Sequence, residues 1–237
     1  MIPIQTQSAW RGTSDCRSCA VRELALFSNL NEEDFVHIHA PIDDLAYRVN
    51  QVIFSEGEEA TGIFTLRSGM LKLSRVTGDG RRRILRLLRP GDVVGLEALA
   101  TGRYDSEAAA LTSATLCRIP TEVVHRLSQQ SSRMHAGLLN KWQKTLREAD
   151  DWLASINFGT ARQRVCQFIL KMRHATDPGI ATLFSREDMG AMMDLKLETV
   201  SREVSALVKA GAIQPIDKQG RLYRIVDEAM LQPSAGN

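Results

Sequence analysis

The chain has 237 residues, of which 43% are hydrophobic and 24% charged, which suits one large or two modest globular domains. Its formal net charge of +2 is too small to indicate a nucleic-acid partner by itself. No apolar run reaches the roughly 18 residues that a membrane-spanning helix needs, and the first residues lack the pattern of a secretory signal, so we expect a cytoplasmic protein with no membrane partner.

Residues 1–20 are predicted to form a polar arm that carries two of the four cysteines, Cys16 and Cys19. Disulfide frameworks are rare in cytosolic proteins. A close cysteine pair in such a protein is more typical of a metal site, a cluster or a redox-active thiol. The other two cysteines, Cys117 and Cys166, stand far along the chain.

Residues 21–130 are predicted to be mostly β-structure. Short apolar runs at 63–66, 70–73, 84–88 and 115–119 are separated by recurring glycines. The segment TGDG at 77–80 indicates a hairpin turn, because glycine permits the positive φ angles that such turns require. Short strands at regular spacing with glycine turns are typical of a barrel or roll.

Residues 131–157 are predicted to form one long helix. Its apolar positions recur in steps of three and four, as in a heptad seam. A helix packed on its own domain would explain the pattern, and so would a helix paired with its twin in a homodimer. The narrow stripe favours the dimer. The expected seam residues are Leu139, Trp142, Leu146, Ala149, Leu153 and Ile156.

Residues 158–237 contain a pattern typical of a helix-turn-helix. A first amphipathic helix is expected at about 160–173. Ser185 is a good N-cap for a short helix at 186–193, Asp194 and Leu195 make a turn, and a second helix follows from about 196 to 210. Gly211 ends that helix. Its inward positions are Val200, Val204, Leu207 and Val208.

The polar face of the second helix suits the reading of base edges in a DNA major groove. Arg202 can donate two hydrogen bonds to guanine, Glu198 can accept from cytosine, and Ser201 can bond to either edge. Alternatively, Glu198 and Arg202 are an exposed ion pair one helical turn apart. Further candidate DNA contacts are Lys196, Thr199 and Ser185.

A predicted hairpin after this helix favours the DNA-binding interpretation. Strands are expected at 213–216 and 221–226, with a turn between them. This hairpin would lie as a wing beside the second helix. Lys218 and Arg221 at its tip could contact phosphates, which position a protein on DNA without reading sequence.

Four segments resemble the CRP/FNR family: GIFTLRSGMLKL (62–73), RPGDVVGLEAL (89–99), TLCRIP (115–120) and LETVSREVSALVKAG (197–211). The resemblance implies an α+β protein with an N-terminal cyclic-nucleotide-binding-like β-roll, a long dimerisation helix and a C-terminal winged helix-turn-helix. It also implies a homodimeric transcription regulator that acts on RNA polymerase, and not an enzyme. Glu198, Ser201 and Arg202 match the E-x-x-S-R motif of the oxygen-responsive branch, which implies a TTGA…TCAA palindrome.

The resemblance does not extend to the residues that hold a cyclic nucleotide. The family's glutamate falls at Leu96, with Glu97 adjacent, and its Arg-Ser pair falls at Asp105 and Ser106. A carboxylate at Asp105 would repel a phosphate. We therefore do not expect cyclic AMP to bind.

The resemblance implies a second chemistry, an iron–sulfur cluster held by C-x2-C-x5-C and one distant cysteine. Cys16, Cys19 and Cys117 match three of those positions, whereas Ala25 occupies the fourth and cannot ligate. Asp15 or Glu23 could complete the set, and Cys166 is expected to be a core residue. The alternatives left open are zinc, a thiol–disulfide switch, a small-molecule ligand in the roll, and a dimer with no cofactor.

Three further expectations complete the prediction. The seam carries Ala149 where some oxygen-responsive relatives place an acid, so we expect a dimer that is stable without a cofactor. The segment 77–83, with three successive arginines, is either a polymerase contact or a solvated hairpin. The five histidines show no catalytic or metal-binding spacing, and neither a Walker loop nor a GxGxxG motif is present, which argues against an enzyme.

Overall fold

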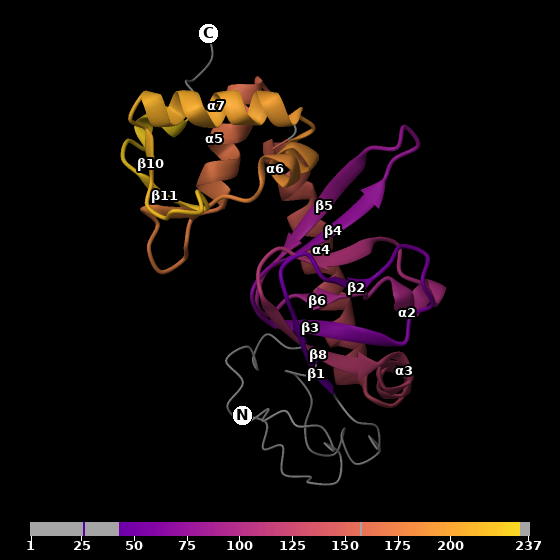
Figure 1. Cartoon of the computed structure of the whole chain (residues 1–237). Helices are drawn as coiled ribbons and strands as arrows, with labels where there is room; N and C mark the ends of the chain where they lie inside the picture. The colour runs from indigo at the N-terminus through magenta and orange to yellow at the C-terminus, as the bar shows by residue number, and fades with distance from the viewer. Residues whose placement is uncertain (1–25, 27–42, 157, 233–237) are drawn as a thin grey trace. The chain divides into compact units, whose positions relative to one another are not determined.

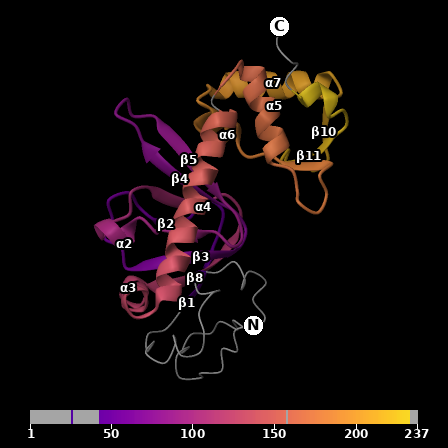
Figure 2. The same ribbon diagram turned by 180° about the vertical axis from the view of Figure 1, so that it is seen from behind.

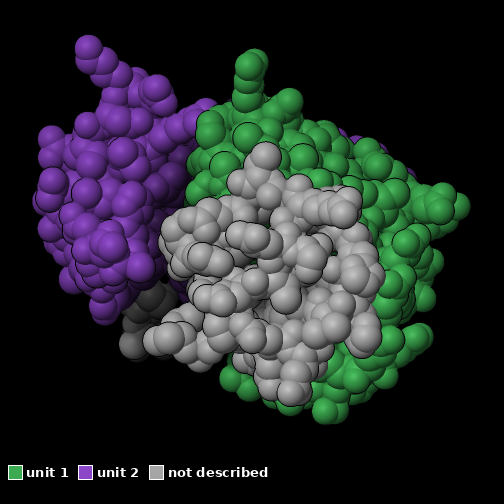
Figure 3. All heavy atoms as spheres, turned by 90° about the horizontal axis from the view of Figure 1, so that it is seen from below, with its two compact units in different colours: residues 1–75, 85–147 green, residues 76–84, 148–237 purple. Residues whose placement is uncertain are grey.

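The computed structural model describes residues 26, 43–156 and 158–232. The chain forms two compact units, one of residues up to 75 and 85–147, and one of residues 76–84 and 148–237 (Figure 3). No helix among the described residues is long and apolar enough to cross a membrane.

The first unit is built on two four-stranded sheets (Figure 1). One has the order β1-β8-β3-β6, with β1 at Asp43–Tyr47, β8 at Ala114–Pro120, β3 at Gly62–Ser68 and β6 at Val93–Val94. The other has the order β2-β7-β4-β5, with β2 at Val52–Phe54, β7 at Glu107–Ala110, β4 at Leu71–Val76 and β5 at Arg82–Leu88. Buried side chains from both sheets form one apolar cluster that includes Phe54, Leu66, Leu71 and Leu116. The expected roll is confirmed.

Glycine turns connect the strands as the sequence indicates. Between β3 and β4, Gly69 has φ +83°, and a Cβ there would lie 2.2 Å from the carbonyl oxygen of Ser113. Between β4 and β5, the amide of Gly80 donates to the carbonyl of Thr77 at 2.8 Å, and the amide of Thr77 donates to the carbonyl of Arg81 at 2.9 Å. The predicted hairpin at 77–80 is therefore confirmed.

The end of the segment predicted to be mostly β-structure is helical. Residues Thr121–Gln130 form helix α3, and a short helix α2 spans Ala98–Thr101. Val123, Val124 and Leu127 are buried on one side of α3, which is the spacing of an amphipathic helix. The sequence analysis did not detect that the apolar spacing changes here from that of a strand to that of a helix, because the preceding segment is rich in strand-forming residues.

Helix α4 spans Ser132–Ile156 and is seen from behind as one continuous helix (Figure 2). The hydroxyl of Ser131 accepts a hydrogen bond from the amide of Met134 at 3.2 Å, which satisfies one of the free amides at the start of the helix. Met134 and Leu138 are buried in an apolar cluster with Ile119, Val124 and Leu26. The first turns of α4 are thereby fixed on the roll.

The second unit contains helices α5 (Ala161–Lys171), α6 (Arg186–Met193) and α7 (Leu197–Lys209). A three-stranded antiparallel sheet has the order β10-β11-β9, with β9 at Ile180–Thr182, β10 at Ile213–Pro215 and β11 at Leu222–Ile225. A 3-10 helix, η1, spans Ala229–Leu231. The predicted helices and wing are confirmed, and Thr160 starts α5 with a capping box to Gln163.

Candidate nucleic-acid interface

The first helix of the helix-turn-helix, α6, is held at its start by Ser185. The hydroxyl of Ser185 accepts from the amide of Asp188 at 3.0 Å and donates to the carboxylate of Asp188 at 2.8 Å. Asp188 also places a negative charge in the first turn, where the helix dipole favours it. The predicted cap is confirmed, and the hydroxyl of Ser185 is engaged in it.

The turn between α6 and α7 depends on two special backbone positions. Asp194 has φ +53°, a left-handed conformation that aspartate tolerates better than most residues. The amide of Leu195 donates to the carbonyl of Gly190 at 3.0 Å, and a Cβ on Gly190 would lie 2.5 Å from the carbonyl oxygen of Leu195. Sequence reasoning missed the role of Gly190, although a glycine inside a helical segment is a signal of close backbone approach.

Helix α7 buries one face and exposes the other. Val200, Val204 and Leu207 are buried, whereas Val208, which was predicted to face inward, is only half-buried. Polar side chains fill the outer face of the first two turns, where a reading helix meets base edges. Of these, Glu198, Arg202 and Ser205 are exposed, Thr199 and Ser201 are half-buried, and the exposed Lys196 is the N-cap residue.

Arg202 is free to point away from the domain. Its side chain is 69% exposed, and its Nε lies 3.6 Å from a carboxylate oxygen of Glu203. The alternative interpretation required an ion pair between Arg202 and Glu198. Among the ion pairs of the described residues, Arg202 instead pairs with Glu203. A single long contact at the surface stabilises little, so Arg202 can exchange it for a base.

Leu197 is a candidate that sequence reasoning missed. It stands three residues before Val200, so its spacing continues the buried stripe, yet it is 47% exposed. The reason is its place at the first residue of α7, beyond the edge of the core. The sequence carried no signal of this exposure, because the spacing of Leu197 predicts burial.

The wing is closed by Asp217. Its Oδ1 accepts hydrogen bonds from the amides of Arg221 at 2.8 Å and Leu222 at 2.9 Å. These bonds, that from Leu222 first, lower the pKa of the Asp217 carboxyl below its usual value. Lys218 and Arg221 are exposed at the tip, as a phosphate-contacting wing requires.

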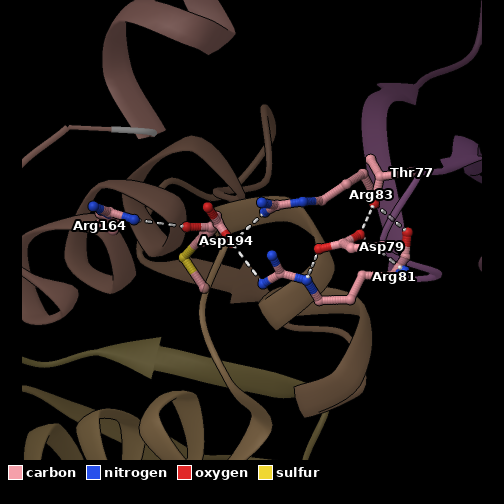
Figure 4. A network of polar contacts seen from close by, with 7 residues as sticks. Thr77, Asp79, Arg81, Arg83, Arg164 and Asp194 are labelled. Carbon is pink, nitrogen blue, oxygen red and sulfur yellow. Dashed lines mark hydrogen bonds and ion pairs between the residues drawn. The ribbon is translucent and has the colours of Figure 1, made fainter.

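The tip of the β4–β5 hairpin belongs to the same compact unit as the helix-turn-helix, and it contacts the turn before α7 (Figure 4). The Nη1 of Arg83 lies 2.6 Å from Oδ1 of Asp194, and the Nη1 of Arg81 lies 3.8 Å from the same oxygen. From the other side, Arg164 donates to the carbonyl of Met193 at 3.1 Å. Two of the three successive arginines are therefore engaged with the helix-turn-helix, which the sequence did not indicate.

The predicted dimer seam is exposed over most of its length. Leu139, Trp142, Leu146 and Leu153 are 52%, 38%, 64% and 57% exposed, and Ala149 is half-buried. The prediction that Ile156 belongs to the dimer seam is wrong, because this residue is fully buried in its own chain. The final turn of α4 faces the core of the second unit, so the exposed seam ends at Leu153.

The positions at which the family would hold a cyclic nucleotide bring two carboxyl groups near one another in the roll. Leu96 is buried, and burial, with a further contribution from nearby Asp105, raises the pKa of the Glu97 carboxyl. Asp105 lies 3.9 Å from the guanidinium of Arg75, and Arg103 donates to the carbonyl of Gly57 at 2.7 Å. Two carboxyl groups near one another disfavour an anionic ligand.

Of the candidate metal ligands, only Cys117 lies in the described part of the chain; Cys16 and Cys19 lie outside it, as does Ala25. Cys117 is half-buried in β8, and its thiol donates to a carboxylate oxygen of Asp44 at 3.4 Å. Cys166 is buried, and burial raises the pKa of its thiol, as expected of a core residue.

Comparison with known proteins agrees with this architecture. Residues 45–131 match the Cyclic nucleotide-binding domain, and residues 163–233 match the Crp-like helix-turn-helix domain. The chain is 25% identical to the Anaerobic regulatory protein of Aggregatibacter actinomycetemcomitans, over 93% of this chain and 88% of that protein. It is 26% identical to the Transcriptional activator protein anr of Pseudomonas aeruginosa, over 93% and 92%.

Among solved structures, that of FixK2 from Bradyrhizobium japonicum superposes with a TM-score of 0.71 at 25% identity, covering 83% of this chain and 100% of that one. The two domain matches, in the order found in this chain, and the similarity to regulators over most of its length confirm the resemblance. The chain belongs to the CRP/FNR family of DNA-binding transcription regulators.

Proposed function

We propose that this protein regulates transcription as a homodimer that reads a TTGA…TCAA palindrome with helix α7. One observation carries the proposal: the outward face of the first two turns of α7 presents Glu198, Ser201 and Arg202 while the opposite face is locked in the core. Arg202 suits guanine O6 and N7, and Glu198 suits the amino group of cytosine. A guanine–cytosine pair occurs once in each TTGA half-site.

The exposed seam on α4 supports the dimer. Large apolar side chains that recur on one face of a soluble helix mark a protein-binding surface. The same spacing of three and four allows a twin helix to pack along it as a coiled coil. A two-fold axis through this seam gives each palindrome half its own α7, since symmetric sites require symmetric readers.

Leu197 supports the thymine-rich part of the half-site. The C5 methyl of thymine is the apolar group that base pairs present in the major groove. Leu197 lies on the reading helix next to Glu198, and its exposed apolar surface would be covered by such a methyl group. Lys218 and Arg221 of the wing, together with Lys196 and Thr199, would contact the phosphates on either side. Ser185 would have to release the hydrogen bond that its hydroxyl donates to Asp188 before it joined them.

The signal is proposed to be oxygen or redox state, read through Cys16, Cys19 and Cys117. The relative named Anaerobic regulatory protein supports this direction. The donor set does not fit a four-cysteine cluster, because Ala25 has no ligating atom. Cys117 with Asp44 beside it is the described part of the set. RNA polymerase is the proposed partner through which bound protein alters transcription.

Selection from random duplex DNA tests the reading proposal. The expected product is a palindrome with TTGA half-sites, and a different core would contradict the assignment of Glu198, Ser201 and Arg202. Anaerobic purification with iron and sulfide counts tests the signal. Iron with sulfide indicates a cluster completed by a ligand other than cysteine, whereas metal-free protein whose DNA binding changes with thiol oxidation indicates thiol chemistry. DNA binding that is equal before and after air would contradict redox sensing.

A further inference from the structure

Asp194 occupies the turn that sets the direction of α7, and its side chain is held from outside the helix-turn-helix. Its backbone ends α6 in a left-handed conformation. The start of α7 receives no side-chain cap, so the carboxylate of Asp194 does not serve that helix. Instead it accepts from Arg83, with Nη1 and Oδ1 2.6 Å apart. The carboxylate of Asp194 is therefore held by a residue of the β4–β5 hairpin.

The hairpin tip is itself ordered by a local network (Figure 4). The carboxylate of Asp79 accepts from the hydroxyl of Thr77 at 2.5 Å, from the amide of Arg81 at 3.2 Å and from Nε of Arg81 at 2.5 Å. These bonds fix the guanidinium of Arg81 by one edge and leave its Nη1 3.8 Å from Asp194. Arg81, the residue before β5, and Arg83 within β5 are thus presented together to the same oxygen of Asp194.

Three positive groups surround the single negative charge of the turn. Arg83, Arg81 and Arg164 together lower the pKa of the Asp194 carboxyl, the hydrogen bond from Arg83 first. The guanidinium groups of Arg83 and Arg81 come from the hairpin and share one oxygen of Asp194, so they tie the turn to the hairpin.

We propose that Arg83, assisted by Arg81, is a positioning residue for DNA reading: it holds Asp194 and thereby fixes the direction in which α7 enters the groove. The inference rests on the proposed reading role of α7. Neither arginine needs to touch DNA for this role.

A double-mutant cycle tests the proposal with full-length protein and the TTGA…TCAA duplex, or the site that selection recovers. The variants are Arg83→Gln, Asp194→Asn and both together, since asparagine also tolerates the left-handed conformation. Each single change is expected to lower affinity for the palindrome about threefold per half-site, hence about tenfold in the dimer, the size of a surface ion pair. The double variant should be no worse than either single variant.

Binding to a scrambled duplex and its salt dependence separate positioning from phosphate contact. A positioning role leaves affinity for scrambled DNA and the salt slope unchanged. Equal losses on both duplexes with a smaller salt slope would show that Arg83 contacts phosphate and would overturn the proposal. Additive effects in the cycle, or no effect at all, would also overturn it.

Arg82→Gln is the matched control, because it removes the same charge from the next position on the strand, which faces the other way. It should leave discrimination between the two duplexes unchanged. Thermal unfolding of every variant checks that the fold is intact, and Arg83→Lys, which keeps the charge, is a second variant should Arg83→Gln fail to fold. If the wild-type protein shows no preference for any DNA sequence, the proposed function fails. If the wild-type protein does prefer a sequence but none of the variants in the cycle changes its affinity, only this inference fails.

Discussion

Helices α4 and α7 each bury one face and expose the other, but the exposed faces differ in kind. On α4 the exposed stripe is apolar, with Leu139, Leu146 and Leu153 each more than half exposed. On α7 the exposed face is polar, with Glu198 and Arg202 at its centre. An apolar stripe loses contact with water only by meeting another apolar surface, whereas a polar face can exchange water for base edges.

The difference separates two requirements of one function. The α4 stripe can determine whether two copies associate, and the α7 face can determine which sequence they read. Changes in the stripe should remove binding to every palindrome, whereas changes in the reading face should alter preference among sequences. Experiments that vary one face at a time therefore test whether the two roles are distinct.

The largest effect is expected from Leu146→Glu. Its side chain is 64% exposed in the single chain, so the monomer should fold, but two carboxylates would face each other in a paired seam. Because the two half-sites then bind independently, affinity for the palindrome should fall at least about 100-fold. Sedimentation should show monomers, whereas wild-type protein without added metal should be dimeric at micromolar concentration.

Asn140→Glu is the control for that change, because Asn140 is exposed on the same helix and stands at heptad position b, away from the seam. It adds the same charge and should leave both the dimer and DNA binding intact. A dimeric Leu146→Glu protein would show that the α4 stripe is not the dimer contact. A monomeric wild-type protein would contradict the expectation that the uncharged seam suffices without a cofactor.

The second effect is expected from Arg202→Gln. Loss of a bidentate contact with guanine should cost about 1–3 kcal/mol per half-site, and preference at the guanine position should relax. Lys209→Gln removes the same charge from the exposed far end of α7 and is the matched control. A competition series with one base pair changed at a time measures the preference. Equal losses for both variants at every sequence would reduce Arg202 to a general phosphate contact.

The reading face and the seam could be predicted from the sequence because each depends on local periodicity. The positions of Val200 and Val204 are enough to turn Glu198 and Arg202 outward, and Leu139, Trp142 and Leu146 define their stripe in the same way. End effects were not predictable by that argument. Periodicity alone predicts that Leu197 is buried and that Ile156 is exposed, whereas in the structure Leu197 is exposed and Ile156 is buried. The reason is that the end of a helix can lie beyond the core on which the helix packs, or against a different core.

Contacts between distant segments were beyond the reach of sequence reasoning. Arg83 and Asp194 stand far apart in the chain and join only in the folded unit. The close approach of Gly190 to Leu195 likewise depends on the geometry of the turn. Sequence reasoning identified three successive arginines but had no means to find their partner.

A smaller effect is expected from Leu197→Ala together with uracil-substituted DNA. Replacing thymine by uracil removes only the C5 methyl group, which should weaken wild-type binding about twofold to fourfold, the cost of exposing about one methylene-sized apolar group. The alanine variant should bind more weakly than wild type and respond less to uracil. Substitution at one thymine at a time identifies the partner. Equal responses of both proteins to uracil would separate Leu197 from the thymine methyl groups.

The smallest effect concerns the wing and its dependence on pH. The pKa of Asp217 is lower in the folded chain than in an unfolded one, so the stabilisation is fully present above the ordinary carboxyl pKa, about 3.9. This stabilisation is lost as the pH falls from the ordinary carboxyl pKa through the lower pKa that Asp217 has in the folded chain. Exchange of the amide protons of Arg221 and Leu222, measured between pH 5 and pH 3 after correction for intrinsic rates, should show protection declining with acid. In Asp217→Asn the protection should be lower and independent of this titration, and an unchanged pH profile in that variant would show that the carboxylate does not close the wing.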